Sequence, residues 1–347
     1  MRLVIKFCFS FIINLRRKKF IRKVLLIVFK TYLSGFFDGI QSRVLLQSFF
    51  TALFVLLAVQ LFTIGVLSER LPIEVSRPYY QELKSFSFEP REKFIIDNVD
   101  GAVNITPSKG SKIIVNADAR GYPSRYKDRE RVRRFSKNLF QIIESDRSIS
   151  IETEPRPRPE GVEFRVDYQI TVPEGINLEV NVTGRGSVYI TAGAKDVSVH
   201  ANQGDITIIQ PEGEIFAQTI LGRIDVSQIK DSADIQTING AIYTTMIKGK
   251  IRANSVNGNI QATLLSENIE ICDLSVTNGN ITLIIPELFS SKILAKTHRG
   301  YVTSEFALGE ITPGTQVRQI EKQIGKGVAD LKLTSMNGKI LISRLVQ

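Results

Sequence analysis

The residues of this 347-residue chain that could carry chemistry are its carboxylates, two histidines and two cysteines. Acid–base catalysis needs such groups clustered on one face, and a structural metal site needs several Cys, His or carboxylate ligands together. Two Cys and two His are too few for a zinc ribbon, an iron–sulfur cluster or a disulfide framework. We therefore expect no metal site and no cofactor.

The carboxylates hold different positions relative to a glycine that recurs along the chain. Asp205, Asp225 and Asp234 lie one after, three after and six before a repeat glycine. Glu214 and Glu270 lie eight and nine residues before theirs. Carboxylates at different offsets do not gather when equivalent positions stack. We predict a non-catalytic protein, with a carbohydrate-active enzyme as the weakest alternative.

The histidines and cysteines have structural interpretations. His298 precedes an Arg-Gly turn, and we expect both it and His200 to be surface residues. Cys272 falls in an apolar column and is expected in the core. Cys8 lies on the other side of a predicted membrane span, so we predict no disulfide between the two.

The glycine repeat is the main feature of the sequence. Its steps are 18 residues four times, then 21 twice and 38 once. The repeat glycines are Gly186, Gly204, Gly222, Gly240, Gly258, Gly279, Gly300 and Gly338. The second residue after each is β-branched and aliphatic, giving a column of Val188, Ile206, Ile224, Ile242, Ile260, Ile281, Val302 and Ile340. Nine such copies occur if the outlying one at Gly101 is included. This column predicts a core ladder.

The residues around each glycine alternate between apolar and polar, which indicates strand, turn and strand. Asn precedes the glycine in several copies, and Asn-Gly turns tolerate positive φ. A rung of 18 residues has a contour of about 60 Å, enough for two or three short strands. The fold class we predict is all-β, a single-stranded β-helix or solenoid with 18-residue rungs stacked in sequence order.

The N-terminal part of the chain has a different composition. Residues 44–67 form 24 residues without a formal charge, which as a helix would extend about 36 Å. Residues 1–43 carry ten Lys or Arg against Asp38 alone. The positive-inside rule then predicts one transmembrane helix, a signal anchor, with the N-terminus in the cytoplasm and the solenoid outside the cytoplasmic membrane. A cleaved signal peptide is the alternative.

The basic cluster ahead of the span has two interpretations. It consists of Arg16, Arg17, Lys18, Lys19, Arg22 and Lys23. It could bind anionic lipid on the inner leaflet, or it could only set topology. Nucleic-acid binding by this N-terminal segment is a third and weakest interpretation. Residues 44–347 contain 35 basic and 34 acidic residues, and we expect no nucleic-acid partner for the chain.

The remaining segments complete the predicted domain organisation. Residues 68–93 are expected to be a stalk or linker, and residues 94–180 an N-terminal cap with irregular coils and a short helix near 128–140. Residues 181–347 form the regular solenoid, with 307–327 as a loop before the final coil.

Several motifs together resemble a known bacterial envelope family. They are YQITVPEGINLEV, INGAI, VNGNI, TNGNI, MNGKI and GKGVADLKLTSMNGKILIS. The chain resembles the family named putative adhesin from about Phe94 to Val346, over a degenerate repeat without catalytic residues. The resemblance implies an extracytoplasmic β-solenoid, often anchored by one helix, and acting in envelope stress or surface contact.

The leading functional hypothesis is a single-pass membrane protein that displays a solenoid for binding, adhesion or scaffolding at the cell envelope. The partner would be an unknown protein or polysaccharide, and exposed end rungs would permit self-association. The alternative is a sensor or accessory component of an envelope-stress signalling system.

Overall fold

The computed structural model describes residues 78–124, 126–153, 160–191, 193–246, 248–266, 268–308 and 312–345. They all belong to one compact unit, Ser76–Gln347. The predicted inner-leaflet segment 1–43, its basic cluster and the predicted span 44–67 lie outside the described residues. Among those that are described, no helix has both the length and the apolar character to cross a membrane.

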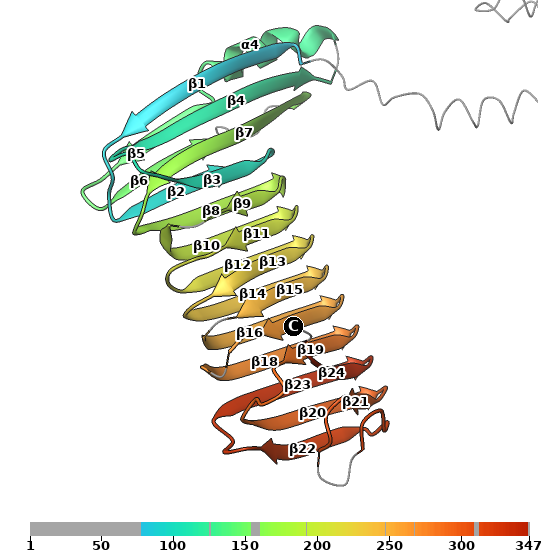
Figure 1. The fold of residues 1–347 in the computed structure, drawn as a ribbon. Coiled ribbons are helices and arrows are strands. Elements are labelled where there is room, and N and C mark those ends of the chain that lie inside the picture. Colours follow the sequence, from blue (N-terminus) through green and yellow to red (C-terminus); the bar gives the residue numbers. More distant parts are fainter. Residues whose placement is uncertain are drawn as a thin grey trace, which may run out of the picture. The chain divides into compact units, whose positions relative to one another are not determined.

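The chain winds into a β-solenoid in which a regular rung adds one strand to each of two twelve-stranded sheets (Figure 1). The strands of sheet A, in spatial order, are β1 (Tyr80–Phe88), β4 (Ile113–Pro123), β7 (Val162–Pro173), β3 (Val103–Ser108), β9 (Val188–Ile190), β11 (Ile206–Ile209), β13 (Ile224–Ile229), β15 (Ile242–Met246), β17 (Ile260–Leu264), β19 (Ile281–Ile285), β24 (Ile340–Arg344) and β21 (Val302–Ser304).

Sheet B forms the opposite wall of the solenoid. Its strands, in spatial order, are β22 (Gln319–Ile324), β20 (Ser291–Arg299), β23 (Ala329–Asn337), β18 (Ile269–Asn278), β16 (Gly249–Asn257), β14 (Ser232–Asn239), β12 (Ile215–Leu221), β10 (Ala194–Gln203), β8 (Ile176–Arg185), β2 (Lys93–Asn98), β6 (Ser148–Thr153) and β5 (Phe140–Glu144). Pairing between regular rungs is parallel in both sheets.

The core lies between the two sheets because apolar residues alternate with polar ones along each strand. In β17, for example, Ile260, Ala262 and Leu264 are buried, whereas Gln261 is exposed. Each inward position lies beside its equivalent on the next rung, as Ile242 pairs with both Ile224 and Ile260. The sequence period therefore becomes a set of dry columns parallel to the solenoid axis.

The final coil is not where sequence order would place it. β23 lies between β18 and β20, and β24 lies between β19 and β21. The rung of β20 and β21 therefore leaves a gap that the C-terminal coil fills. The five-residue connection Pro286–Ser290 reaches about 16 Å when extended, enough to pass the roughly 10 Å of two rungs. The expectation that the rungs stack in sequence order is wrong at this end.

Both ends depart from the regular rung. Residues 80–88, expected in the stalk, instead form β1, which pairs antiparallel with β4. The helix of the cap, α4, spans Arg129–Ser136 after the 3₁₀ turn η1 (Tyr126–Asp128). Within residues 307–327, expected to be a loop, β22 pairs antiparallel with β20. These antiparallel strands lie at the outer side of β4 and β20.

The repeat glycines are needed because successive rungs approach closely at the turn. A Cβ on Gly240 would overlap the backbone carbonyl oxygen of Gly222, and a Cβ on Gly258 would overlap that of Gly240. The predicted role of positive φ at the preceding Asn is wrong: among the described residues other than glycine, only Gln210 and Gln228 have positive φ.

Candidate functional site

The eight repeat glycines lie in one stack at a single corner of the solenoid. Along this stack, Gly279 is followed by Gly338 and then by Gly300, so the spatial order of the last three glycines differs from their order in the sequence. The eight aliphatic residues two positions later lie in sheet A, and each is at most 1% exposed. These residues build the scaffold, and any binding function must use the outward columns that the scaffold positions.

The asparagines before four glycines form a hydrogen-bonded ladder on the same corner. The Nδ2 of Asn257 donates to the Oδ1 of Asn239 at 2.9 Å, and Asn278 donates to Asn257 at 2.8 Å. Asn337 donates to Asn278 at 2.8 Å. On the same strands, hydroxyl side chains that precede these asparagines donate hydrogen bonds to the carbonyl oxygens of repeat glycines. Ser255 Oγ, for example, donates to Gly240 O at 3.1 Å. The corner is therefore held by side chains as well as by backbone.

The five carboxylates considered for catalysis are not brought together. Asp225 lies in sheet A, where Arg223 Nη2 is 2.8 Å from its carboxylate, and Asp205 accepts the backbone N–H of Arg223 at 2.8 Å. Asp234 is on sheet B in β14. Glu214 precedes β12, and Glu270 lies in β18, 3.3 Å from Lys250 Nζ.

The histidines and Cys272 have no shared site either. His200 and His298 are both exposed, and the ring of His200 lies 5.0 Å from that of Phe216. The Cys272 side chain is fully buried, and burial raises the pKa of its thiol to about 12. Among the residues that the structure describes, no three His, Cys, Asp or Glu side chains could share a metal ion.

The outer face of sheet B, which we call the sheet B face, holds three columns of side chains. The charged column is Glu179, Ser198, Phe216, Asp234, Arg252, Asp273, Lys332 and Leu294. The amide column is Asp97, Asn181, His200, Gln218, Gln236, Asn254, Ser275, Thr334 and Lys296. The corner column is Lys93, Asn177, Asp196, Glu214, Ser232, Lys250, Ile271, Asp330 and Lys292.

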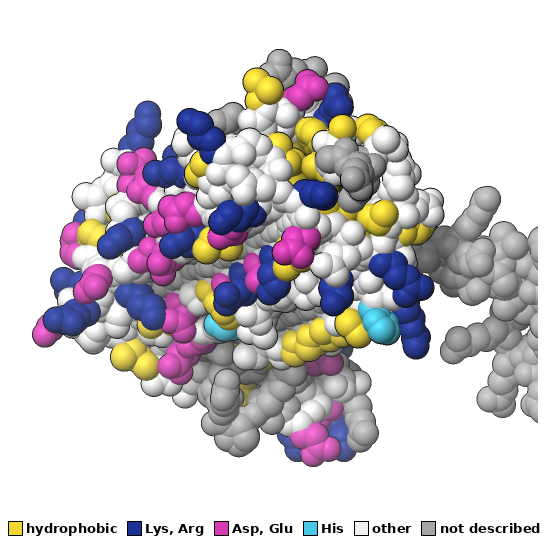
Figure 2. Space-filling model, turned by 90° about the horizontal axis from the view of Figure 1, so that it is seen from below, with side chains coloured by type: hydrophobic (Ala, Val, Ile, Leu, Met, Phe, Trp, Pro, Cys, Tyr) yellow, Lys and Arg dark blue, Asp and Glu magenta, His cyan; other side chains and the backbone are white. Residues whose placement is uncertain are grey.

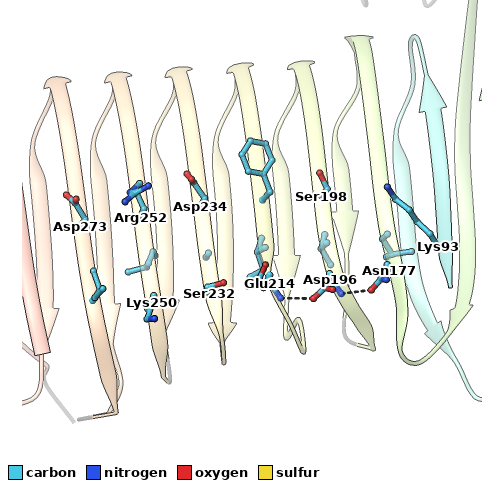
Figure 3. A pocket seen from close by; sticks show the side chains of 17 residues that line it. Lys93, Asn177, Asp196, Ser198, Glu214, Ser232, Asp234, Lys250, Arg252 and Asp273 are labelled. Carbon is cyan, nitrogen blue, oxygen red and sulfur yellow. Dashed lines mark hydrogen bonds between the residues drawn. The ribbon is translucent and has the colours of Figure 1, made fainter. Parts of the chain in front are cut away.

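A shallow groove of about 590 Å³ follows this face over several rungs. Figure 3 shows side chains of the charged and corner columns in two rows across parallel strands, from Lys93 to Asp273. Along the corner column, Asp196 N donates to Asn177 Oδ1 at 3.4 Å, and Glu214 N donates to Asp196 Oδ1 at 3.0 Å. Stacking at about 4.8 Å therefore gives this surface a fixed spacing of polar groups.

Ion pairs satisfy some charges of the sheet B face and leave others available. Lys93 pairs with Glu179 and holds the pKa of that carboxyl below its usual range by donating a hydrogen bond to it. Lys332 Nζ lies 3.4 Å from Asp273. Among the described residues, by contrast, no ion-pair partner reaches the side chains of Glu214 and Arg252. These two groups are available to an external ligand.

The two outer faces differ in charge. On the outward positions of the regular strands of sheet A, uncharged residues such as Tyr189, Thr207 and Tyr243 dominate. Seen from the end of the solenoid that β21 and β22 form, the surface has Lys or Arg intermingled with Asp or Glu on one side (Figure 2). We take the sheet B face as the candidate site because it combines a groove, amides and unpaired charges.

Sequence reasoning missed this face as a candidate site. In the regular rungs its columns are the residues four, six and eight before the repeat glycine, so the signal was present at those offsets. A search for carboxylates at one shared offset cannot find this face, because each of its columns holds acidic, basic and uncharged residues at the same offset.

Comparison with known proteins gives one family. Residues 92–343 match the family described as Toastrack DUF4097. The chain is similar to a putative adhesin of Bacteroides fragilis (14% identity, 77% of this chain and 97% of that one, TM-score 0.41). It is also similar to a putative cell adhesion protein of Clostridium sporogenes (13%, 78% and 100%, TM-score 0.22). No curated protein matches it.

Proposed function

This chain belongs to the Toastrack DUF4097 family, and from that premise we propose that it is a membrane-anchored, non-catalytic envelope protein whose solenoid displays a binding surface. The sheet B face is that surface. The observation that supports it most is the stack of amide and charged side chains at rung spacing along the groove. Such an array makes many weak, regularly spaced contacts with an extended partner.

The anchoring part of the proposal rests on composition. The uncharged stretch 44–67 follows a segment with ten Lys or Arg, which favours a signal anchor with the N-terminus inside. The solenoid would then lie outside the cytoplasmic membrane.

Cysteine labelling tests the anchoring. Full-length protein with Gln261→Cys is treated in spheroplasts with a membrane-impermeant maleimide. We expect the thiol introduced by this substitution to be labelled in intact spheroplasts and Cys8 only after lysis, whereas Cys272 stays unlabelled because it is buried. Labelling of Cys8 in intact spheroplasts, or loss of the protein from the membrane pellet in carbonate, would refute the anchor.

Carboxylate footprinting tests the binding surface. Glu214 and Asp234 lie on the sheet B face, whereas Glu212 is an exposed carboxylate on a turn outside its columns. Carbodiimide coupling to an amine is compared between spheroplasts and dilute purified protein. We expect Glu214 and Asp234 to be protected in spheroplasts and Glu212 to react equally in both. Equal reaction at all three would refute the proposed surface.

A further inference from the structure

We infer that the sheet B face binds the sheet B face of a second copy of this chain, with the two solenoids antiparallel. This inference rests on the proposed function, because it names the partner of the same surface. It follows from the distribution of charge, the area of the face and the symmetry that relates two identical copies.

The three columns divide the face into two halves of opposite charge. From β2 to β14 they contain Asp97, Glu179, Asp196, Glu214 and Asp234 against Lys93, a formal charge of −4. From β16 to β20 they contain Lys250, Arg252, Lys292, Lys296 and Lys332. Asp273 and Asp330 oppose these, which leaves a formal charge of +3. We call these the acidic half and the basic half.

Two identical copies can bring these halves together in only one orientation. A two-fold axis along the solenoid would place acidic half against acidic half. A two-fold axis parallel to the strands reverses the solenoid direction and places acidic half against basic half. Like charges in contact cost energy and opposite charges direct association, so the antiparallel pair is favoured.

The antiparallel pair also matches individual residues. An axis close to β14 places β12 against β16 and β8 against β23 of the second copy, and it keeps each column opposite itself. Glu214 then faces Lys250 of the second copy, Glu179 faces its Lys332 and Asp97 faces its Lys296. Against these three opposite-charge pairs stand two like-charge pairs, Asp234 with its own counterpart at the axis and Lys93 with Lys292. Phe216 faces Arg252 of the second copy, an arrangement suited to a cation–π contact. Glu214 and Arg252, two of the charged residues of the face that have no ion pair among the described residues, thereby both gain partners.

The area of the face is sufficient for a specific dimer. The nine strands from β2 to β20 cover about 43 Å at 4.8 Å each, and six residues along a strand cover about 20 Å. Each copy would therefore contribute about 850 Å². Stable interfaces bury about 800 Å² on each partner.

Charge reversal with complementation in trans tests the inference. Full-length protein carrying two different tags is co-expressed and purified in detergent. One variant, E214K/D234K, brings the acidic half from a formal charge of −4 to 0, and the other, K250E/R252E, brings the basic half from +3 to −1. We expect wild-type copies to co-purify, each variant to co-purify with itself at least ten-fold less, and the two variants mixed to recover wild-type yield. K109E/K127E, which reverses two exposed lysines away from the face, is the matched control and should behave as wild type.

Each other result overturns the inference. Co-purification of the variants with themselves at wild-type yield would mean association through another part of the chain. A mixture no better than the single variants, or wild-type copies that do not co-purify, would refute the dimer. Protection of Cys272 from maleimide in each variant verifies folding. Glu214 and Asp234 could be protected in the footprinting experiment while the charge-reversal variants co-purify as well as wild type. In that case the binding surface is supported and its partner is a different molecule.

Discussion

The residue that limits this fold is the repeat glycine, because each turn rests on the turn of the neighbouring rung. The requirement is steric and comes from the neighbouring backbone, since a Cβ would meet a carbonyl oxygen that is itself fixed by the sheet. A glycine in an open turn meets no such constraint.

Gly240→Ala is therefore expected to destabilise the solenoid by about 1–3 kcal/mol, the range for overpacking. Gly110→Ala is the control, because a Cβ there approaches only the flexible Ser108 side chain. Urea denaturation of both variants measures the difference. Equal midpoints would contradict the close-approach explanation.

Ile260 tests the core column at a single position. Ile260→Asp places an unpaired carboxylate between apolar rungs and is expected to cost at least about 4 kcal/mol. Gln261→Asp, whose side chain points outward on the same strand, should cost under about 0.5 kcal/mol. Circular dichroism and protease resistance report the result, and an intact middle of the domain in Ile260→Asp would contradict an interior column.

Glu179 gives the solenoid a defined pH dependence. Its pKa is lower in the folded state, so its pair with Lys93 adds stability above the unfolded pKa of about 4.3, and that stability is lost as pH falls through the folded pKa. Lys93→Met should lower the melting temperature at pH 7 and have little effect below about pH 3. Lys112→Met, which removes an exposed pair with Glu89, should change little at either pH. An equal effect of Lys93→Met at both pH values would contradict the role of the pair.

At the scale of elements, the C-terminal coil is the part that completes the stack. β23 and β24 each have a strand on both sides, although they are the last two strands of the chain. The contacts that close this end join residues about 60 positions apart in the chain, such as Asp273 and Lys332. We therefore expect this end to be completed late in folding, because long-range pairing must first overcome the entropy of closing the loop.

Removing the C-terminal coil by ending the chain after residue 328 should expose strand edges on β18 and β20. We expect the truncated protein to aggregate or to bind a hydrophobic dye, and a peptide of residues 329–345 to reverse the effect. Ending the chain after residue 345 is the control. Unchanged unfolding of the 328 truncation would contradict an inserted coil.

The elements also mark how far sequence reasoning reached. The period of 18 correctly indicated β-rungs with Ile242 and Ile260 on one side. Residues 80–88 were predicted to be a stalk because they lack the repeat glycine, but they form β1, which pairs antiparallel with β4. The period missed β22 for the same reason, since strands outside the repeat share none of its columns.

At the scale of the whole molecule, a solenoid contacts itself mainly between neighbouring rungs. Stability is then expected to be greatest where a rung has neighbours on both sides. In the antiparallel pair that we propose, the first rung of one copy would lie at the last rung of the other.

Hydrogen exchange measures the distribution of stability along the axis. Amides of β14 and β16, each paired on both sides, should exchange slowest, and those of β22, which lies at the edge of sheet B, should exchange fastest. Equal exchange rates in all these strands would show that the amides exchange only through global unfolding, and would contradict a gradient of stability along the axis.

The sequence by itself determined the local repeat: which residues turn, which face inward and that equivalent positions stack. These depend on side-chain periodicity and on the size of glycine, and both can be read along the chain. Only the tertiary structure decided the order of the last rungs, because the copies at Gly279, Gly300 and Gly338 have equivalent columns and any of them could be neighbours. That order brings Asp273 beside Lys332, so that the two side chains form an ion pair on the sheet B face.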